Sequence, residues 1–330
     1  ITQTDKGELL MIDSVGVSKS TDGGKTWSTP VPAKLPEGTK LFHGTAGSLL
    51  LCTRGGTLIL LYMDSASQKW SWNTDLMKPG PDARLDAWAC RSTDGGHTWT
   101  DCRKVVDGYC GALIDVKQLS TGEIVAIMQD LLYDEGRHYL YPIVSTDDGR
   151  TWKRGNNIDL GGRGDHDGAL EPTIVELKDG RVIMYIRTNL DRFWTAYSET
   201  KGLYWRTIEP GPVTASSAPG HLLRLKSGRI ALVYNQLKAE AAKEVEHSMP
   251  YSTHAEVIPS WFRKELSITF SEDEGKTWSK PRVIASTETL REICYPYIVV
   301  RSPGEIWVVI RIAGGHKSCF SLRETDFLDR

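Results

Sequence analysis

The stretch STDGGHTW at residues 92–99 decides the fold, because close copies of it recur along the chain. The shared pattern is Ser-x-Asp-x-Gly-x-Thr-Trp, in which Ser and Asp can bond to backbone N–H groups, Gly can take a positive φ, and Trp can pack between neighbouring sheets. The other full copies are STDGGKTW (20–27), STDDGRTW (145–152) and SEDEGKTW (271–278), and SETKGLYW (198–205) carries Thr200 in place of the aspartate. The pattern predicts a repeated turn that its aspartate braces.

A second kind of turn alternates with this motif. Polar-Gly turns separate runs rich in β-branched and aromatic residues, such as TIVEL and RVIMYI, which is typical of paired strands. These turns lie at Gly7, Gly56, Gly122, Gly180, Gly228 and Gly304, and each of the first five is followed by one of the motifs above. A unit of four strands repeated six times predicts an all-β fold, a six-bladed β-propeller forming a single domain over residues 1–330. Residues 64–86 and 238–262 are expected to be insertions.

Composition narrows the class of partner. A formal net charge of −2 favours neither nucleic acid nor an anionic membrane surface. No apolar run approaches the roughly 18 residues of a membrane span. The chain starts at Ile1 without a methionine or a signal peptide, so a mature or trimmed form of a secreted or periplasmic protein is expected. The sequence carries no signal for an oligomeric state.

The six cysteines do not predict a metal site. They are residues 52, 90, 102, 110, 294 and 319, and no two of them form a CxxC pair. The aspartates also lack the ligand spacing of an EF-hand, so no metal or cofactor is expected. Cys90 and Cys102 flank one turn and could form a disulfide, or both could remain buried free thiols.

Two predicted hairpins place chemically capable residues in the same register. Glu171 lies nine positions before the turn at Gly180, and Tyr295 lies nine before Gly304. An arginine lies seven positions after each of these glycines, at Arg187 and Arg311. Across an antiparallel pair these positions are near neighbours at one sheet edge. A carboxylate, a phenol and two guanidinium groups at that edge predict a site for an anionic ligand.

Asp-box turns on a six-bladed propeller resemble the sialidase (neuraminidase) superfamily, and the resemblance spans essentially the whole chain. Glu171 and Arg187 look like the glutamate and arginine that sialidases place around a D-G turn. Arg263, before the strand leading into a late Asp box, and Tyr295, at the start of the last blade, match a second arginine and the nucleophilic tyrosine. The resemblance therefore implies a retaining exo-glycosidase that acts on terminal sialic acid or a related 2-keto acid sugar.

The residue types suit such a substrate. Sialic acid carries a carboxylate on its anomeric carbon, which arginines can hold with paired, permanently charged donors. A neutral phenol avoids the repulsion that a carboxylate nucleophile would meet, but with an unperturbed pKa of about 10 it needs a base. Glu171 would supply that base. Sialidases are an exception to the usual pair of carboxylates in glycoside hydrolysis.

Two parts of the family pattern are displaced. An Arg-Ile-Pro stretch expected in the first blade would fall before Ile1, so its arginine is either trimmed or replaced by Arg311, Arg54 or Arg163, with Arg311 favoured by its register. The general-acid aspartate has no counterpart on the short loop after Asp13. Asp64 follows the apolar strand LILLYM and is the first choice for this role, with Asp13 and Asp86 as alternatives.

Further residues are expected on the same rim. Gln129 and Asn235 lie seven positions after Gly122 and Gly228, and neutral amides suit recognition of hydroxyl and N-acyl groups. Both could instead cap strands. His43 and the loop 163–168 are expected near the same face.

Three functions remain open at this stage. The leading hypothesis is an exo-α-sialidase with Tyr295 as nucleophile and Glu171 as its base. An alternative is a lyase or hydrolase of uronate polysaccharides, in which a histidine abstracts a proton and Tyr295 donates one. The third is a propeller that only binds glycans, which would leave Tyr295 more than roughly 3.2 Å from Glu171 without a bridging water.

Overall fold

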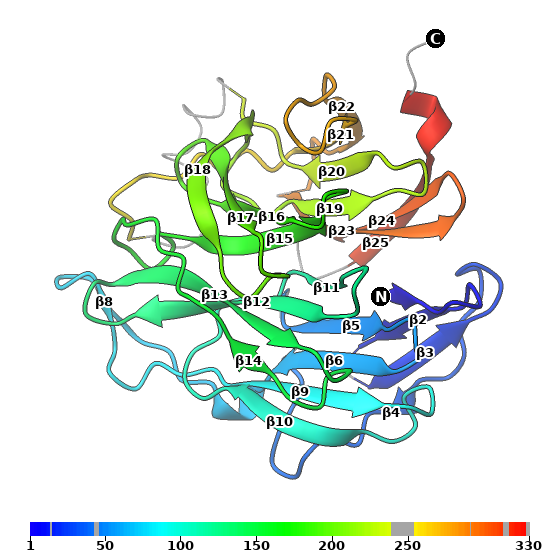
Figure 1. Ribbon diagram of the computed structural model, residues 1–330. Coiled ribbons are helices and arrows are strands. Elements are labelled where there is room, and N and C mark those ends of the chain that lie inside the picture. Colours follow the sequence, from blue (N-terminus) through cyan, green and yellow to red (C-terminus); the bar gives the residue numbers. More distant parts are fainter. Residues whose placement is uncertain (14, 43–45, 239–253, 291, 313–316, 328–330) are drawn as a thin grey trace.

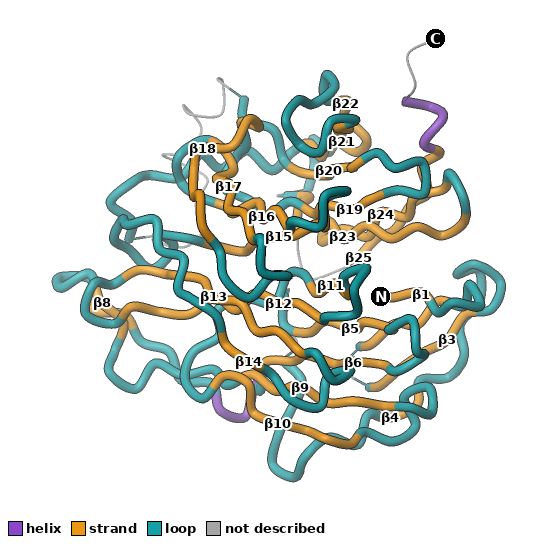
Figure 2. The backbone as a smooth tube through the Cα atoms, viewed as in Figure 1, coloured by secondary structure: helices purple, strands orange, loops and turns teal. Residues whose placement is uncertain are grey.

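The sheets follow the predicted repeat. The computed structural model describes residues 1–13, 15–42, 46–238, 254–290, 292–312 and 317–327. It contains five four-stranded sheets and one three-stranded sheet, all antiparallel, arranged as the six blades of a β-propeller (Figure 1). Among the described residues, helix is confined to two short 3-10 segments, η1 (Ser65–Ser67) and η3 (Glu324–Phe327), as Figure 2 shows.

Each blade is a meander whose strands follow one another in sequence. The strands are β1 (Thr2–Gln3), β2 (Leu9–Ile12), β3 (Gly16–Ser20) and β4 (Val31–Pro32) in blade one; β5 (Ser48–Cys52), β6 (Leu58–Met63), β9 (Ala87–Ser92) and β10 (Thr100–Val106) in blade two; β11 (Val116–Gln118), β12 (Ile124–Leu132), β13 (Arg137–Ser145) and β14 (Lys153–Arg154) in blade three; β15 (Leu170–Glu176), β16 (Val182–Arg187), β17 (Arg192–Ser198) and β18 (Arg206–Thr214) in blade four; β19 (His221–Arg224), β20 (Ile230–Tyr234), β21 (Glu265–Ser271) and β22 (Arg282–Ser286) in blade five; and β23 (Ile293–Ser302), β24 (Glu305–Ile312) and β25 (Lys317–Arg323) in blade six.

The first strands of the blades form a closed circle. Contacts run from β1 to β5, then to β11, β15, β19 and β23, and β23 returns to β1. Such closure leaves the first strands at the centre of the ring, where residues of different blades can meet. The predicted six-bladed propeller is therefore confirmed.

The core lies between blades rather than in one central cluster. Buried residues of neighbouring blades pack together, as Leu61 of β6 does with residues of blade three and Val125 of β12 with residues of blade four. Trp205, which is 2% exposed, belongs to the cluster between blades three and four. The motif tryptophans Trp99, Trp152 and Trp278 pack against the other interblade clusters. The repeated tryptophan thus joins its own blade to the preceding one.

The motif turns are held by side-chain hydrogen bonds. In the second copy, Asp94 Oδ1 accepts the backbone N–H of Thr98 at 2.9 Å, and Ser92 Oγ accepts that of Gly96 at 2.9 Å. The degenerate fifth copy keeps this arrangement, because Thr200 Oγ1 accepts the N–H of Tyr204 at 2.8 Å. A hydroxyl therefore replaces the missing carboxylate as the acceptor.

The turn carboxylates should contribute stability that depends on pH. Hydrogen bonds from Thr277 lower the pKa of Asp273 from 3.8 to about 2. A group whose pKa falls on folding stabilises the protein above its unfolded pKa, and this contribution is lost as the pH falls through its folded pKa. We expect Asp273→Asn to unfold at a lower temperature than the parent at pH 7, and the two melting curves to converge between pH 4 and about 2. Thermal unfolding followed by circular dichroism across this range measures the difference, and an undiminished gap at pH 2 would contradict the assignment.

The first predicted insertion contains structure of its own. Residues 64–86 include η1 and a small hairpin of β7 (Trp72–Asn73) and β8 (Lys78–Pro79) between β6 and β9. In the second, residues 239–253 lie outside the described part of the chain.

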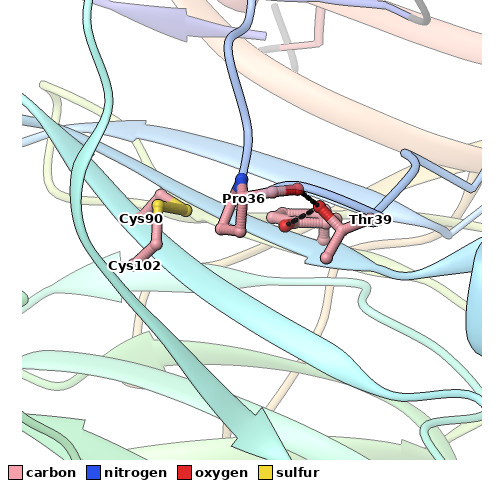
Figure 3. The surroundings of a disulfide bond; sticks show 5 residues. Pro36, Thr39, Cys90 and Cys102 are labelled. Atoms are coloured by element: carbon pink, nitrogen blue, oxygen red, sulfur yellow. Dashed lines mark hydrogen bonds between the residues drawn. A yellow bond between two sulfur atoms is a disulfide. The ribbon is translucent and has the colours of Figure 1, made fainter.

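Cys90 and Cys102 form a disulfide, so the first of the two alternatives for this pair holds. The bond joins β9 to β10 beside Pro36 and Thr39 of the connection between blades one and two (Figure 3), where Thr39 Oγ1 donates to Pro36 O at 2.8 Å. Closing a loop with a sequence separation of 12 residues is worth roughly 3 kcal/mol in the chain-entropy treatment of a disulfide.

Candidate active site

Tyr295 and Glu171 meet at the centre of the ring. Tyr295 lies in β23 of blade six and Glu171 in β15 of blade four, yet Tyr295 Oη donates to Glu171 Oε1 at 2.6 Å. This distance is within the range expected of a nucleophile and its base. The long separation expected of a propeller that only binds glycans is not observed.

Both residues have an unusual backbone. The φ angle is +39° at Glu171 and +52° at Tyr295, in a region that bulky side chains rarely adopt. The strand pairing is also irregular there, between Leu170 and Thr173 and between Cys294 and Tyr297. Such bulges re-aim a side chain, and a left-handed non-glycine residue costs of order 1–3 kcal/mol. The equivalent positions of the two hairpins therefore share a strained geometry that directs their side chains toward each other.

Two buried arginines flank the pair. Arg187, at the end of β16, donates from Nη1 to Glu171 Oε2 at 2.5 Å and from Nε to Ser217 Oγ at 3.1 Å. Arg263 donates from Nη2 to the carbonyl of Ser217 at 2.8 Å, and its guanidinium lies 3.5 Å from the ring centroid of Trp261. Both arginines are no more than 3% exposed. Ser217, which precedes the first strand of blade five, thus fixes both cations between blades four and six.

Each arginine has one side-chain nitrogen that forms no hydrogen bond with the described residues. Within the described residues, Arg187 Nη2 and Arg263 Nε are buried without a hydrogen-bond partner. Guanidinium groups normally satisfy such donors, since an unpaired buried donor costs about 1–3 kcal/mol. Opposite Arg263, Glu292 Oε2 lies 3.5 Å from Nη1, so one carboxylate accompanies each cation. Both nitrogens are buried, so they are unpaired polar atoms beside the Tyr295–Glu171 pair.

The pKa values of Glu171 and Tyr295 are shifted in opposite directions. Burial raises the pKa of Glu171, but the charge of Arg187 and the hydrogen bonds from Tyr295 and Arg187 outweigh it and hold that pKa below its usual value. Burial and the negative charge of Glu171 raise the pKa of Tyr295 well above 10. At neutral pH the site therefore holds an ionised carboxylate that accepts the proton of a neutral phenol.

Tyr295 also borders a cavity of about 640 Å³. Asp13 of blade one lines the same cavity, together with apolar side chains of blades one, two and six such as Leu49 and Trp307. A space of this size falls in the usual range for small-molecule sites.

The structure gives Asp64 a local role. Its side chain is the N-cap of η1, and its Oδ1 accepts the backbone N–H groups of Ala66 at 3.0 Å and Lys40 at 2.9 Å. Asp86 is also engaged elsewhere, with Arg84 at 2.9 Å and Lys104 at 2.7 Å. Asp13 accepts N–H bonds from Val15 and Gly16 through Oδ1. Of the three candidate acids, Asp13 is the one that shares a cavity wall with Tyr295.

The side-chain amides of Gln129 and Asn235 form hydrogen bonds with backbone groups of the protein. Gln129 Oε1 accepts the backbone N–H of Glu171 at 2.8 Å, so its side chain contacts the backbone beside the Tyr295–Glu171 pair. Asn235 Nδ2 donates to the carbonyls of Glu265 and Ile293 at 2.7 and 3.0 Å. Asn235 therefore braces strand ends, as in the alternative reading of its position.

Arg54 and Arg163 are engaged away from this cluster. Arg54 donates to Leu119 O and Ser120 O beside the glycine turns, at the blade edge opposite Glu171. Arg163 Nη2 donates to Leu76 O at 2.8 Å. The backbone of Arg311 pairs with Cys294 in the expected register, but its side chain lies outside the described part of the chain, as does all of His43.

The sequence reasoning missed three contributors. Trp261 supports Arg263, Ser217 joins the two arginines, and His138 holds Gln129 through a 3.2 Å contact between Nδ1 and the amide nitrogen. Trp261 stands two positions before Arg263, which was the only available signal. Ser217 precedes blade five and His138 lies in blade three, and neither residue is part of a recognisable sequence motif.

Comparisons with known proteins place the chain in a family. Residues 13–308 match the family described as BNR repeat-like domain. A sialidase of Clostridium perfringens is 27% identical over 215 residues, which is 59% of this chain and 53% of the relative. A solved protein of unknown function from Dyadobacter fermentans superposes with a TM-score of 0.65 at 18% identity, covering 97% of this chain and 92% of that one. A sialidase of Streptococcus pneumoniae does so with a TM-score of 0.64 at 14% identity, covering 98% and 68%.

The fold and the family match define a BNR-repeat β-propeller whose curated relatives are sialidases. The chain belongs to the BNR repeat-like domain family within the sialidase superfamily. It spans about half the length of the first curated relatives that it matches.

The described residues contain no group of three or more His, Cys, Asp or Glu side chains placed to share a metal ion. Among these residues there is also no helix long and apolar enough to cross a membrane.

Proposed function

We propose that this protein is an exo-acting glycoside hydrolase that releases terminal sialic acid, or a related 2-keto acid sugar, with retention of configuration. The observation that carries the proposal is the 2.6 Å hydrogen bond from the Tyr295 phenol to the Glu171 carboxylate. This hydrogen bond lies between Arg187 and Arg263, which are both buried and each have one nitrogen without a hydrogen-bond partner among the described residues. This combination suits a substrate whose reacting carbon bears a carboxylate.

In the proposed first step, Tyr295 Oη attacks the anomeric carbon while its proton passes to Glu171. The glycosidic bond breaks, and the leaving oxygen takes a proton from a general acid. In the second step a water attacks the same carbon and gives one proton to the general acid deprotonated in the first step, the bond to Tyr295 breaks, and Glu171 returns its proton to the phenol oxygen. Two displacements at one carbon retain its configuration.

The arginines have separate tasks in this scheme. Arg187 holds Glu171 ionised through Nη1 and offers Nη2 to the substrate carboxylate. Arg263 offers Nε from its place against Trp261. We keep Arg311 as a third contact on the strength of its register with Cys294.

The general acid is better assigned to Asp13 than to Asp64. Both carboxylates accept backbone N–H groups through Oδ1, but Asp13 also lines the cavity that Tyr295 borders. The disulfide between Cys90 and Cys102 supports a secreted or periplasmic location, because such bonds persist in oxidising compartments.

We expect the protein to release 4-methylumbelliferone from its α-sialoside. Proton NMR of the first product formed should show the α-anomer, since two displacements retain configuration. Release of the β-anomer would contradict the tyrosyl intermediate. Inactivity on sialosides with appearance of an ultraviolet-absorbing unsaturated uronate from acidic polysaccharides would identify the lyase alternative. Saturable glycan binding without turnover would identify the propeller that only binds.

A further inference from the structure

The backbone of Glu171 is held by a side chain from a neighbouring blade. Glu171 has a φ of +39° at a break in strand pairing, so its N–H is not part of the regular β15–β16 ladder. That N–H instead donates to Gln129 Oε1 at 2.8 Å, in a buried setting. Gln129 lies in β12 of blade three and is 4% exposed.

The orientation of the Gln129 amide follows from a chain of contacts. His138 Nε2 lies 2.8 Å from the carbonyl oxygen of Asp165, and a carbonyl can only accept, so Nε2 carries the proton. In a neutral ring Nδ1 is then an acceptor, and the group 3.2 Å away must be the amide nitrogen of Gln129. The amide oxygen is thereby turned toward the N–H of Glu171.

The histidine is suited to this role because it stays neutral. His138 is 3% exposed. Burial lowers its pKa to about 4, against the opposing effect of the hydrogen bond to Asp165. The ionisable groups that influence it are Asp165, His166 and Glu171. Its Nδ1 therefore remains an acceptor at neutral pH.

We propose that Gln129 is a positioning residue, oriented by His138, that holds Glu171 in the left-handed conformation from which its carboxylate reaches Tyr295. The inference rests on the proposed function for its kinetic consequence. Both polar ends of the Gln129 amide are used within the protein, which distinguishes this role from direct binding of substrate.

The physical reason is the cost of the left-handed backbone. Without an acceptor, the buried N–H of Glu171 would be unsatisfied, and the strand could relax toward an extended conformation to find one. Relaxation would rotate the carboxylate away from the phenol, and a displacement of about 1 Å can lower a rate about 100-fold. The loss should appear in kcat, because binding of the substrate carboxylate by arginine is left in place.

The test uses substitutions at both positions. Gln129→Met keeps the volume and removes both hydrogen bonds, and we expect kcat for a fluorogenic sialoside to fall about 10- to 100-fold with KM changed less than about threefold. His138→Asn places an amide oxygen near the position of Nδ1 and should retain more activity than His138→Leu. This order separates an oriented acceptor from simple filling of space.

A distant amide provides the control. Asn156 Oδ1 accepts the N–H of Trp205 at 2.8 Å and its Nδ2 donates to the Trp205 carbonyl at 3.0 Å, so it also braces a backbone across two blades. Asn156→Ala should lower the melting temperature and leave kcat unchanged. If Gln129→Met keeps the parental kcat while the parent hydrolyses sialosides, the positioning role is wrong and the proposed function stands.

A second readout does not depend on turnover. The hydrogen-bonded phenol proton of Tyr295 should give a downfield proton NMR signal, assigned by its loss in Tyr295→Phe. The signal should shift upfield or broaden in Gln129→Met and persist in Asn156→Ala. An unchanged signal in Gln129→Met would overturn the inference even if the protein proved inactive on every sialoside.

Discussion

Tyr295→Phe is expected to lower kcat for sialoside hydrolysis by at least about 10³-fold. The substitution removes only the oxygen that would form the bond to the anomeric carbon. The aromatic ring remains in place, so Arg263, whose guanidinium lies 5.7 Å from the ring centroid, keeps this contact. Loss of one member of a cooperating nucleophile and base removes most of their joint contribution, so the residual rate should reflect binding and electrostatics alone.

The matched control is another buried tyrosine. Tyr185 is 1% exposed and accepts a hydrogen bond from Trp278 Nε1 at 2.9 Å, between blades four and five. Tyr185→Phe should cost about 1 kcal/mol of stability, as for one hydrogen bond, and should leave kcat unchanged. Steady-state kinetics and thermal unfolding of both variants separate loss of the nucleophile from loss of a buried hydroxyl. Parental turnover by Tyr295→Phe would exclude Tyr295 as the nucleophile.

Glu171→Gln should impair both catalysis and stability. The neutral amide keeps the size of the side chain but cannot take the phenol proton, so kcat should fall by about 10²- to 10⁴-fold. It also leaves Arg187 as a buried cation without its partner, which costs about 3 kcal/mol. Kinetics and denaturant unfolding at pH 7 measure the two effects.

The stability effect should depend on pH with a definite sign. The pKa of Glu171 is lowered in the folded protein, so its contribution is present above its unfolded value of about 4.3 and is lost as the pH falls through the folded value. The difference between parent and variant should therefore shrink in acid. Asp179→Asn, which breaks an exposed pair with Arg181 at 2.8 Å, should cost less than about 1 kcal/mol and leave turnover intact. If Glu171→Gln and Asp179→Asn lost similar amounts of stability, burial of the Glu171–Arg187 pair would not be the cause of the larger expected effect.

The sequence predicted the ring because each turn is a local event. The motif at 92–99 and its copies specify hydrogen bonds between residues only two to four positions apart, as the contacts of Asp94 show. The register of Glu171 with Arg187 followed from one turn glycine, and their pairing is a contact within one blade. Contacts between residues that are close in the sequence, or within one blade, can be predicted without knowing the remainder of the fold.

The contacts between blades could not be read in that way. The approach of Tyr295 to Glu171 was suggested by family resemblance, and the positive φ of both residues had no sequence signal. Gln129 was predicted as a substrate contact at the rim, and its bonds to the Glu171 backbone and to His138 were not foreseen. Asp64 shows the opposite case, in which a suitable residue after a strand is used locally to cap a short helix.

The closed circle of first strands has a consequence for how the protein becomes active. Tyr295 belongs to the sixth blade and Glu171 to the fourth, and β23 contacts both β19 and β1 where the circle closes. A chain that has formed only the first five blades would have Glu171 and both arginines but would lack Tyr295. The activity proposed above would therefore appear only when the circle is complete.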